Sequence, residues 1–529
     1  MRKNRFDILK SSSGVALATF CSRILGLVRA MLEAWVLGGG ALATAWELAL
    51  MAPNLCRRIL GEGALAQALI PLLTHTEAKR DTATMRRQLG VVFCVLGVLL
   101  ALIVVVVSGG AILLRPWITT DYGRMAMTLI PVVMPYAFFI CLIGIIGAFL
   151  NTRRIFFLPA LGALAFNVFL IAVLYGAYYF RCADGARLLE ALGFAVLLSG
   201  AVQLALMVFL LWRSRCMPLF DRGLRGEVGV LRDLWRLVLP GLIGASAIQV
   251  SFLVDRTLAA FLGPYAVPAL NYTERIVYVP LGVFATALSA VLLADMSRAA
   301  AHEQFAELLD DMNLGLRYVF FLCLPLAVFF IVFREEILRL LFLRGSFTET
   351  NLKETGWAMM FYSLGIPTFC ATKIILPAFY ARKDMATPLK MSLIAISCNV
   401  VLNLLLMFPM RQGGIALATV MSSLINNSLL LLALRRSGLE LHWLPVVKAF
   451  LKTSVASLLA VSVYFAYHWL QMRLAVGWLP KDLLPLVFCG SVFALVYLLL
   501  NYLFKSEELP ELLGTFRRRK RPKEVPAGH

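Results

Sequence analysis

Four arginines lie inside strongly hydrophobic stretches near the start of the chain, with Glu33, Glu47 and Glu62 nearby. Arg23 and Arg29 belong to CSRILGLVRAMLEAWVLGGG, and Arg57 and Arg58 belong to PNLCRRILGEGALAQALIP. An arginine in the hydrocarbon core of a bilayer costs roughly 2.5–3.5 kcal/mol on insertion scales, so four facing lipid would cost on the order of 10–14 kcal/mol. The stability of a whole domain is of that size. The arginines must therefore face a watery cavity or each other, and an arginine-lined cavity in a membrane bundle suggests a path for an anion.

A structural explanation of the same arginines stays open. Arg58 and Glu62 are four residues apart and could pair on one helix face. Arg58 could also reach the membrane surface from a helix end. Arg23 and Arg29 are six residues apart, about 240° around a helix, so they can border a wide cavity but cannot share one narrow stripe.

The second half of the chain carries its own charges inside apolar spans. Asp255 and Arg256 lie in one predicted span, and Glu274 and Arg275 lie in the next. Arg275 is the best candidate to join the arginines of the first two spans. Several guanidinium groups would suit a diphosphate, because the guanidinium fork matches phosphate oxygens bidentately. A salt bridge between Arg275 and Glu274 is the alternative.

Oxygen-bearing side chains of three spans could form a cation site. Asn399 and Asn403 are four residues apart and share one face of a predicted helix, Thr419 lies in the next span, and Asp255 could supply a carboxylate. Hard cations prefer such oxygen ligands. Ordinary hydrogen bonding between membrane helices is the alternative reading of these polar residues.

The composition is that of a membrane protein. Of 529 residues, 60% are hydrophobic and 15% are charged, and the mean hydropathy is +0.83, outside the range of soluble domains. Because the apolar runs repeatedly reach the length that crosses the hydrocarbon core, we predict an all-α polytopic membrane protein with about 14 transmembrane helices. The expected spans are 8–37, 43–74, 88–114, 126–150, 155–180, 187–212, 232–263, 267–297, 304–333, 354–381, 386–409, 413–434, 446–470 and 482–504.

The placement of the +20 net charge argues against nucleic acid as a partner. The basic residues gather in alternate loops, so the positive-inside rule predicts a multi-pass protein with both termini in the cytoplasm. The segment 213–236 alone holds six arginines. The basic tail 505–529 is expected to bind anionic lipids of the inner leaflet, and no cleavable signal peptide is expected.

The cysteines and histidines carry no signature of catalysis. Ten cysteines and five histidines are scattered, without a CxxC or a metal-binding spacing. Neither a catalytic metal nor an organic cofactor is predicted, and the chain is not expected to be an enzyme.

An internal repeat is visible in the sequence. GAFLNTRRIFFLPALGALAFNVFLI (147–171) resembles PAFYARKDMATPLKMSLIAISCNVVLNLL (377–405), and AWVLGG (34–39) parallels AAFLGP (259–264). An offset of six helices preserves orientation, so we predict two six-helix lobes related by a parallel pseudo-two-fold repeat, plus two C-terminal helices. Secondary transporters built in this way place their site between the lobes.

The repeat predicts four parts of the chain. They are an N-lobe at 1–216, a C-lobe at 217–440, a helix pair at 441–504 and the tail at 505–529. Prolines inside the spans remove a backbone hydrogen bond and predict kinks, as a protein that rocks between two states would need. The prolines in question are Pro53, Pro131, Pro135, Pro280, Pro367 and Pro377.

Several long motifs resemble those of a known family. SRILGLVR and PNLCRRILGEGALAQALIP are similar to the start of the MurJ/MviN lipid II flippases, and LRLLFLRGSF followed by WAMMFYSLGIPTFCATKIILPAFYARKDMATPLK is similar to the family's later signature. The resemblance covers nearly the whole chain. It implies membership of the multidrug/oligosaccharidyl-lipid/polysaccharide exporter superfamily, with fourteen helices in two lobes around a cationic cavity. It also implies transfer of the lipid-linked peptidoglycan precursor across the bacterial cytoplasmic (inner) membrane.

The resemblance assigns roles to particular residues. The substrate-binding set that it implies is Arg23, Arg29, Arg57, Glu62 and Arg275. The sodium site of some members would correspond to Asp255, Asn399, Asn403, Thr419 and the carbonyl of Ile415, with Na⁺ as coupling ion. Asn403 departs from a carboxylate found in some sodium-binding members, and Thr44 replaces an acidic residue that many members carry. The pair at 441–504 would form a groove for a polyprenyl tail.

The expected function is therefore a flippase that moves undecaprenyl-diphosphate-linked precursor, lipid II, by alternating access. A flippase for another polyprenyl-linked glycan and a cation-coupled multidrug exporter stay open as alternatives. The exporter predicts an acidic, aromatic-rich cavity. A lipid-linked transferase predicts Asp or His clustered at one membrane face, which the sequence lacks. A scaffold that recruits cell-wall synthases through the basic tail is the remaining alternative.

Overall fold

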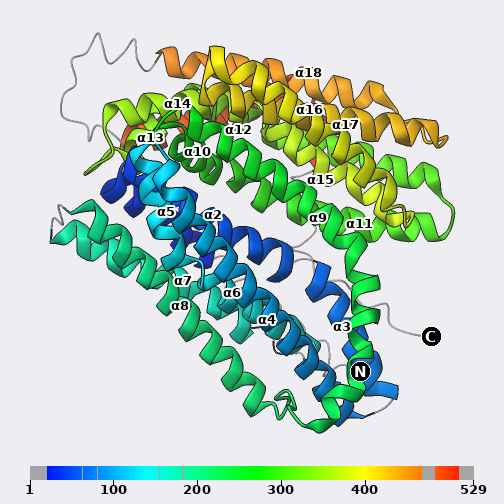
Figure 1. Cartoon of the computed structure of the whole chain (residues 1–529). Helices are drawn as coiled ribbons and strands as arrows, with labels where there is room; N and C mark the ends of the chain where they lie inside the picture. Colours follow the sequence, from blue (N-terminus) through cyan, green and yellow to red (C-terminus); the bar gives the residue numbers. More distant parts are fainter. Residues whose placement is uncertain are drawn as a thin grey trace, which may run out of the picture. The chain divides into compact units, whose positions relative to one another are not determined.

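The computed structural model describes residues 21–61, 64–79, 81–153, 155, 157–180, 184–466 and 483–511. Within these residues every regular element is a helix (Figure 1), which confirms the all-α prediction. They form two compact units. Unit 1 extends to Pro268 and includes Phe342–Asn351, whereas unit 2 consists of Ala269–Leu341 and the residues from Leu352 onward. The lobe boundaries expected near 216 and 440 stay predictions.

Unit 1 begins with a helix over residues 21–37. The helices that follow are α2 (Ala41–Cys56), the π-helix η1 (Arg57–Gly61), α3 (Ala64–Lys79), α4 (Thr82–Leu114), the 3₁₀ turn η2 (Arg115–Trp117), α5 (Asp121–Val133), α6 (Tyr136–Thr152), α7 (Phe157–Tyr179), α8 (Gly185–Arg213), the 3₁₀ helix η3 (Arg222–Glu227) and α9 (Gly229–Phe261). Asp81 caps α4, and hydrogen bonds from the Thr84 side chain and backbone N–H hold the pKa of this carboxyl below its usual value.

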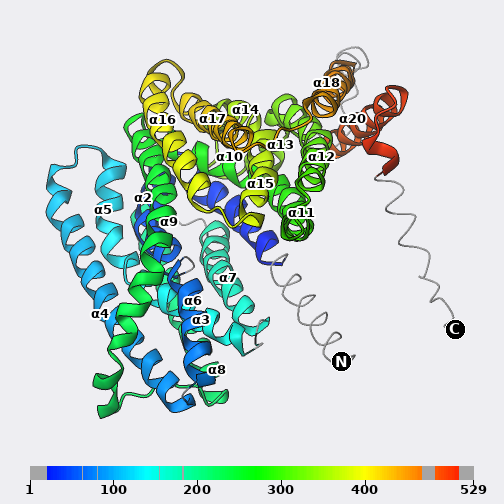
Figure 2. The same cartoon turned by 90° about the vertical axis from the view of Figure 1, so that its right-hand side faces the viewer.

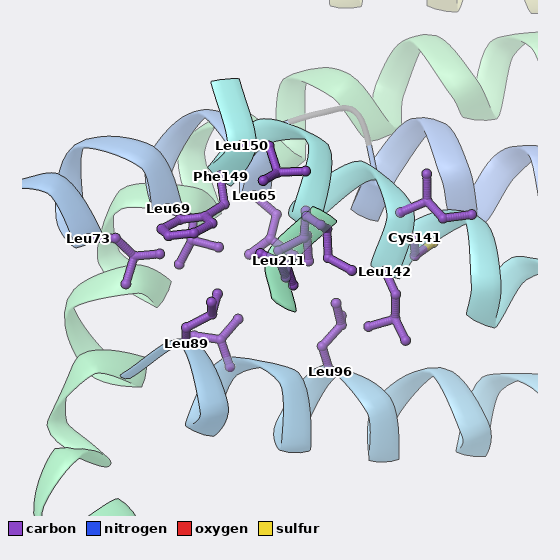
Figure 3. Close-up of a cluster of buried hydrophobic side chains, with 14 of the residues drawn as sticks. Leu65, Leu69, Leu73, Leu89, Leu96, Cys141, Leu142, Phe149, Leu150 and Leu211 are labelled. Atoms are coloured by element: carbon purple, nitrogen blue, oxygen red, sulfur yellow. The ribbon is translucent and has the colours of Figure 1, made fainter. Parts of the chain in front are cut away.

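Leucines at helical spacing build one core of unit 1. Leu65, Leu69 and Leu73 are four residues apart, so they line one face of α3, and all three are buried. Figure 3 shows them pointing toward Leu89 of α4 and Phe149 of α6. Because α3, α4, α6 and α8 all contribute to this cluster, it holds these four helices in one packed body.

Unit 2 contains most of the remaining chain, although α10 and α14 begin inside unit 1 and α13 ends there. The helices of this part are α10 (Ala266–Pro280), the π-helix η4 (Leu281–Ala285), α11 (Thr286–Ala301), α12 (Phe305–Val332), α13 (Arg334–Phe342), α14 (Glu349–Ser363), α15 (Ile366–Ala381), α16 (Ala386–Met410), α17 (Gln412–Arg436), α18 (Trp443–Ala460) and α20 (Leu483–Leu503). Figure 2 shows α16 beside α17 and α18 beside α20, pairs that also pack in contact.

Each predicted span overlaps a helix or a run of helices in the described chain. Eight of the described helices are long and apolar enough to cross a membrane, or nine if the bent pair α5 and α6 is one span. Two of the other predicted spans contain π-helical turns: η1 lies between α2 and α3, and η4 lies between α10 and α11. The protein is thus a multi-pass helical membrane protein, and the count of fourteen stays a prediction.

The internal repeat reappears as a repeated order of irregular elements. The π-helices η1 and η4 begin 224 residues apart, each between two helices of a single predicted span. Likewise α6 and α15 begin 230 residues apart, each directly after a break in its span. A π-helix is uncommon and usually marks a functional position, so its recurrence at the repeat spacing supports the predicted duplication.

The C-terminal tail begins differently from the expected basic, solvated segment. Its first described residues are acidic and bind α12: Arg317 donates to Glu508 at 2.7 Å and to Glu507 at 2.8 Å, and the Tyr318 hydroxyl donates to Glu511 at 2.9 Å. The segment 507–511 at the start of the predicted basic tail is therefore attached to α12 through its carboxylates. The basic stretch beyond residue 511 lies outside the described residues.

The segment Phe342–Asn351 links the later sequence to unit 1. The Ser346 backbone N–H donates to the Trp35 carbonyl at 2.7 Å, and the Arg344 guanidinium lies over the Trp35 ring at 5.0 Å. Gly345 has φ +59° and approaches so closely that a Cβ there would lie 2.2 Å from the Trp35 carbonyl oxygen. The RGSF motif therefore forms a strap that only glycine permits at its centre.

We expect Gly345→Ala to destabilise unit 1 by about 1–3 kcal/mol, since the new methyl group meets backbone at a left-handed φ. The apparent melting temperature of the detergent-solubilised protein should fall by a few degrees. Ser346→Ala is the matched control, because it keeps the backbone hydrogen bond. Equal melting temperatures for the two variants would contradict this account of the strap.

Candidate functional site

Arg29, one of the predicted site arginines, contacts three neighbouring side chains. Its Nη1 lies 2.5 Å from Glu33 Oε1, one helical turn along the first helix, and its Nε donates to Asn167 Oδ1 of α7 at 3.0 Å. The guanidinium also lies over the Phe166 ring at 5.3 Å. This guanidinium is thus held by three chemical groups: a carboxylate, an amide and an aromatic face.

The carboxylate that holds Arg29 is itself buried in an apolar cluster. Glu33 is 1% exposed, and Trp46 of α2, also 1% exposed, directs its indole Nε1 at Glu33 Oε1 over 3.4 Å. Leu32, Leu50 and Leu170 belong to the same hydrophobic cluster. Removing one partner of such a buried pair typically costs about 3–5 kcal/mol. The sequence analysis noted Glu33 but assigned it no role; its spacing of four from Arg29 was the available signal.

The other site residues of unit 1 occupy different surroundings. Arg23 is exposed, and Arg57 is half-buried at the start of the π-helix η1. Asp255 is half-buried on α9. Glu62 lies outside the described residues.

Arg58 has partners that the sequence did not suggest. Its Nη1 donates to Gln249 Oε1 of α9 at 3.1 Å, and its guanidinium lies over Phe252 at 5.1 Å. The same ring receives Arg256 from its own helix at 4.9 Å. Phe252 thus contacts two guanidinium groups through cation–π interactions. Charge and hydrogen-bonding capacity in the sequence do not point to this phenylalanine.

In unit 2, Arg275 is half-buried on α10. The adjacent Glu274 accepts a hydrogen bond from the Tyr362 hydroxyl of α14 at 2.7 Å. The carboxylate considered as a partner for Arg275 is therefore hydrogen-bonded to a tyrosine. Aromatic contacts of Tyr362 with Tyr278 and Phe369 surround this position.

Four residues of the predicted cation site form two hydrogen-bonded pairs, one within α16 and one within α17. Asn403 Nδ2 donates to Asn399 Oδ1 at 3.0 Å, and Thr419 Oγ1 donates to the Ile415 carbonyl at 3.0 Å. Asn403 and Thr419 are each eight residues from Arg411, where the chain turns between these helices, so they lie at similar depth. Their amide, hydroxyl and carbonyl oxygens fit a hard monovalent cation in kind, although they bring no carboxylate. Asp255 belongs to unit 1.

Thr44 has a structural role that an acidic residue could not fill. It is fully buried in α2, and its hydroxyl donates to the Pro264 carbonyl at 2.5 Å. An ionised carboxylate only accepts hydrogen bonds, so it would face this carbonyl with a second acceptor. The replacement noted in the sequence is therefore matched by a hydrogen bond that depends on a donor.

The fold and these buried charges define a polytopic helical transporter. A solved multidrug resistance MATE family transporter of the MOP superfamily, in an inward-facing conformation, shares the fold with a TM-score of 0.64 and 14% identity, over 79% of this chain and 95% of that chain. The solved "Lipid II flippase MurJ, inward closed conformation" is more similar, with a TM-score of 0.76 and 22% identity over 93% of this chain and 98% of that one.

Sequence comparison identifies the family. The family model described as lipid II flippase MurJ matches residues 34–488. The probable lipid II flippase MurJ of Rhizobium tropici is 32% identical over 88% of both chains, and that of Vibrio cholerae serotype O1 is 30% identical over 82% of this chain and 83% of its own. The chain belongs to the MurJ family of lipid II flippases, as the resemblance predicted.

We expect Thr44→Val to destabilise the protein by about 1–3 kcal/mol, because the buried Pro264 carbonyl loses its donor. Thr44→Asp should be at least as damaging. Thr44→Ser retains the hydroxyl and serves as control. Thermal unfolding in detergent measures the difference, and a Thr44→Val protein as stable as Thr44→Ser would refute the assigned hydrogen bond.

Proposed function

We propose that this protein carries undecaprenyl-diphosphate-linked peptidoglycan precursor, lipid II, from the inner to the outer leaflet of the bacterial cytoplasmic membrane by alternating access. Membership of the MurJ family supports the substrate class. The observation in this chain that carries the proposal is Arg29, a half-buried cation held by Glu33 and Asn167 inside apolar surroundings. Such a charge in a membrane protein marks a substrate path more often than a scaffold.

The proposed division of labour follows the chemistry of the substrate. Of the predicted substrate residues, Arg23, Arg29, Arg57 and Arg275 would contact the diphosphate, since a guanidinium group binds two phosphate oxygens at once. Glu62 belongs to the predicted site on the family resemblance alone. The polyprenyl tail would stay in lipid, along the helices of 441–504.

Translocation breaks no covalent bond, so the residues need only bind, release and change orientation. A drug exporter of the shared fold would need a site suited to organic cations, whereas the half-buried charge at Arg29 suits an anion. A flippase for another polyprenyl-linked glycan would use the same diphosphate contacts. The glycan therefore has to be distinguished by experiment rather than by the arginines.

Two further parts of the proposal concern surroundings rather than substrate. Both termini would lie in the cytoplasm, on the basis of the distribution of Lys and Arg. The basic residues beyond 511 would bind anionic lipids of the inner leaflet, and recruitment of cell-wall synthases through them remains an alternative use.

Expression of the protein should rescue a bacterium depleted of its own lipid II flippase, scored by precursor that becomes accessible on the outer face. Arg29→Ala should lower that signal at least about tenfold, the loss expected when one charge-assisted phosphate contact is removed. Arg29→Lys tests whether the bidentate geometry of the guanidinium is required, because lysine keeps the positive charge without that geometry.

Arg187→Ala is the matched control, since Arg187 is an 84% exposed arginine of unit 1. Full rescue by Arg29→Ala at normal membrane levels would refute the role of Arg29. No rescue by a well-inserted wild-type protein would refute lipid II as substrate.

For the coupling ion, we propose Na⁺ at Asn399, Asn403, Thr419 and the Ile415 carbonyl, with Asp255 as carboxylate. Asn403→Asp should then strengthen Na⁺ binding by about tenfold or more, because a carboxylate adds a full negative charge at a buried position. The measurement is the Na⁺-dependent rise in melting temperature, with K⁺ at equal ionic strength as control. Equal responses to Na⁺ and K⁺ in both proteins would exclude this site.

A further inference from the structure

We infer that Glu33 is a resident counter-ion for Arg29, which competes with the diphosphate of the substrate and so favours its release. The inference rests on the proposed function. It assigns a positioning and specificity role to a residue that the substrate is not proposed to touch. It starts from the buried pair of Arg29 and Glu33, whose side chains are 12% and 2% exposed.

The bonds of Arg29 decide what a phosphate would meet. A guanidinium offers two bidentate edges, one through Nε and one between its two terminal nitrogens. Asn167 accepts from Nε, and Glu33 accepts from Nη1, so each edge already has one nitrogen engaged. A diphosphate that binds this fork bidentately must therefore displace or share one of these two acceptors.

The two acceptors are not equal in that competition. The Asn167 amide is neutral, so a phosphate oxygen can take its place as the acceptor from Arg29 Nε at little electrostatic cost. Glu33 is an anion in an apolar cluster, with the Trp46 indole directed at it. When a phosphate binds Arg29, two anions share one guanidinium, and the buried Glu33 carboxylate loses part of its ion pair. Glu33 therefore weakens substrate binding and restores the pair when the substrate leaves.

This role is more specific than stabilising the helix. On an exposed helix, a pair with the acidic residue N-terminal to the basic one is the more favourable orientation, and here the arginine comes first. The Glu33 carboxylate is also buried beneath Trp46, whereas an ion pair that only stabilises a surface helix can stay exposed to solvent. A counter-ion that must re-form its bond after each release would need such a fixed, buried position.

The test compares wild type with Glu33→Gln, which keeps the size and the acceptor oxygen but removes the charge. Undecaprenyl diphosphate in lipid nanodiscs is the binding probe, and flipping of lipid II in proteoliposomes is the transport assay. We expect binding to tighten by about tenfold and flipping to slow by several-fold, because release becomes harder. A residue with a merely structural role would weaken binding and transport together.

Matched variants separate the possible outcomes. Glu33→Asp keeps the charge and should stay within about twofold of wild type in binding. Glu77→Gln removes a carboxylate from another Arg–Glu pair of unit 1, Arg153–Glu77 at 2.6 Å, and should change neither assay. In an Arg29→Gln background, Glu33→Gln should no longer tighten binding, since the coupling requires both partners.

Each result has a defined meaning. Tighter binding with slower flipping in Glu33→Gln, lost in the Arg29→Gln background, supports the inference. Weaker or unchanged binding in a monodisperse Glu33→Gln protein overturns it while the flippase function stands. If Glu33→Gln fails to fold, the Arg29→Gln protein decides instead. Affinity for the probe equal to that of wild type overturns the inference, because Glu33 then has no contact between Arg29 and diphosphate to compete with. Wild type that neither binds the probe nor flips lipid II overturns the proposed function itself.

Discussion

The cost of placing charge inside a bilayer is the constraint on which this structure depends. Arg29 and Glu33 satisfy it by pairing at 2.5 Å within one helix, and Asn167, Phe166 and Trp46 complete their surroundings from two other helices. The first helix is thereby bound to α2 and α7 by a polar contact inside an apolar cluster. The cation that we propose binds the anionic substrate is thus also part of what holds unit 1 together.

Irregular helical turns are the second recurring theme. The π-helices η1 and η4 occupy equivalent places in the internal repeat, and η1 begins at Arg57, a predicted substrate residue. A π-turn widens the helix and leaves local hydrogen bonds weaker than those of an α-helix. It therefore offers a place where a long span can change direction without unfolding. Pro53, four residues before η1, and Pro280, directly before η4, reinforce this property in both halves.

The sequence predicts the fold class well, because hydrophobic length and charge placement are properties of single segments. Helix positions, the repeat and the pairing potential of residues four apart follow from that information. Contacts between distant segments do not: Asn167 beneath Arg29, Phe252 beneath Arg58 and Tyr362 on Glu274 are set by packing. The acidic start of the tail was missed for a related reason, since the basic residues beyond 511 dominated the composition of the segment. Its ion pairs with Arg317 depend on where α20 ends.

The distribution of carboxylates separates this chain from relatives that it resembles. The resemblance indicates acidic residues where this chain has Thr44 and Asn403, and both of these are buried in hydrogen bonds that neutral side chains make. A buried carboxylate appears instead at Glu33, next to Arg29. Because one charge crossing 100 mV is worth about 2.3 kcal/mol, the number and position of such carboxylates change how the membrane potential acts on the empty and loaded protein. A carboxylate at Glu33 on the first helix, in place of one at Thr44 on α2, still compensates the charge of Arg29. It also lies within one helical turn of Arg29, the residue that is proposed to bind phosphate.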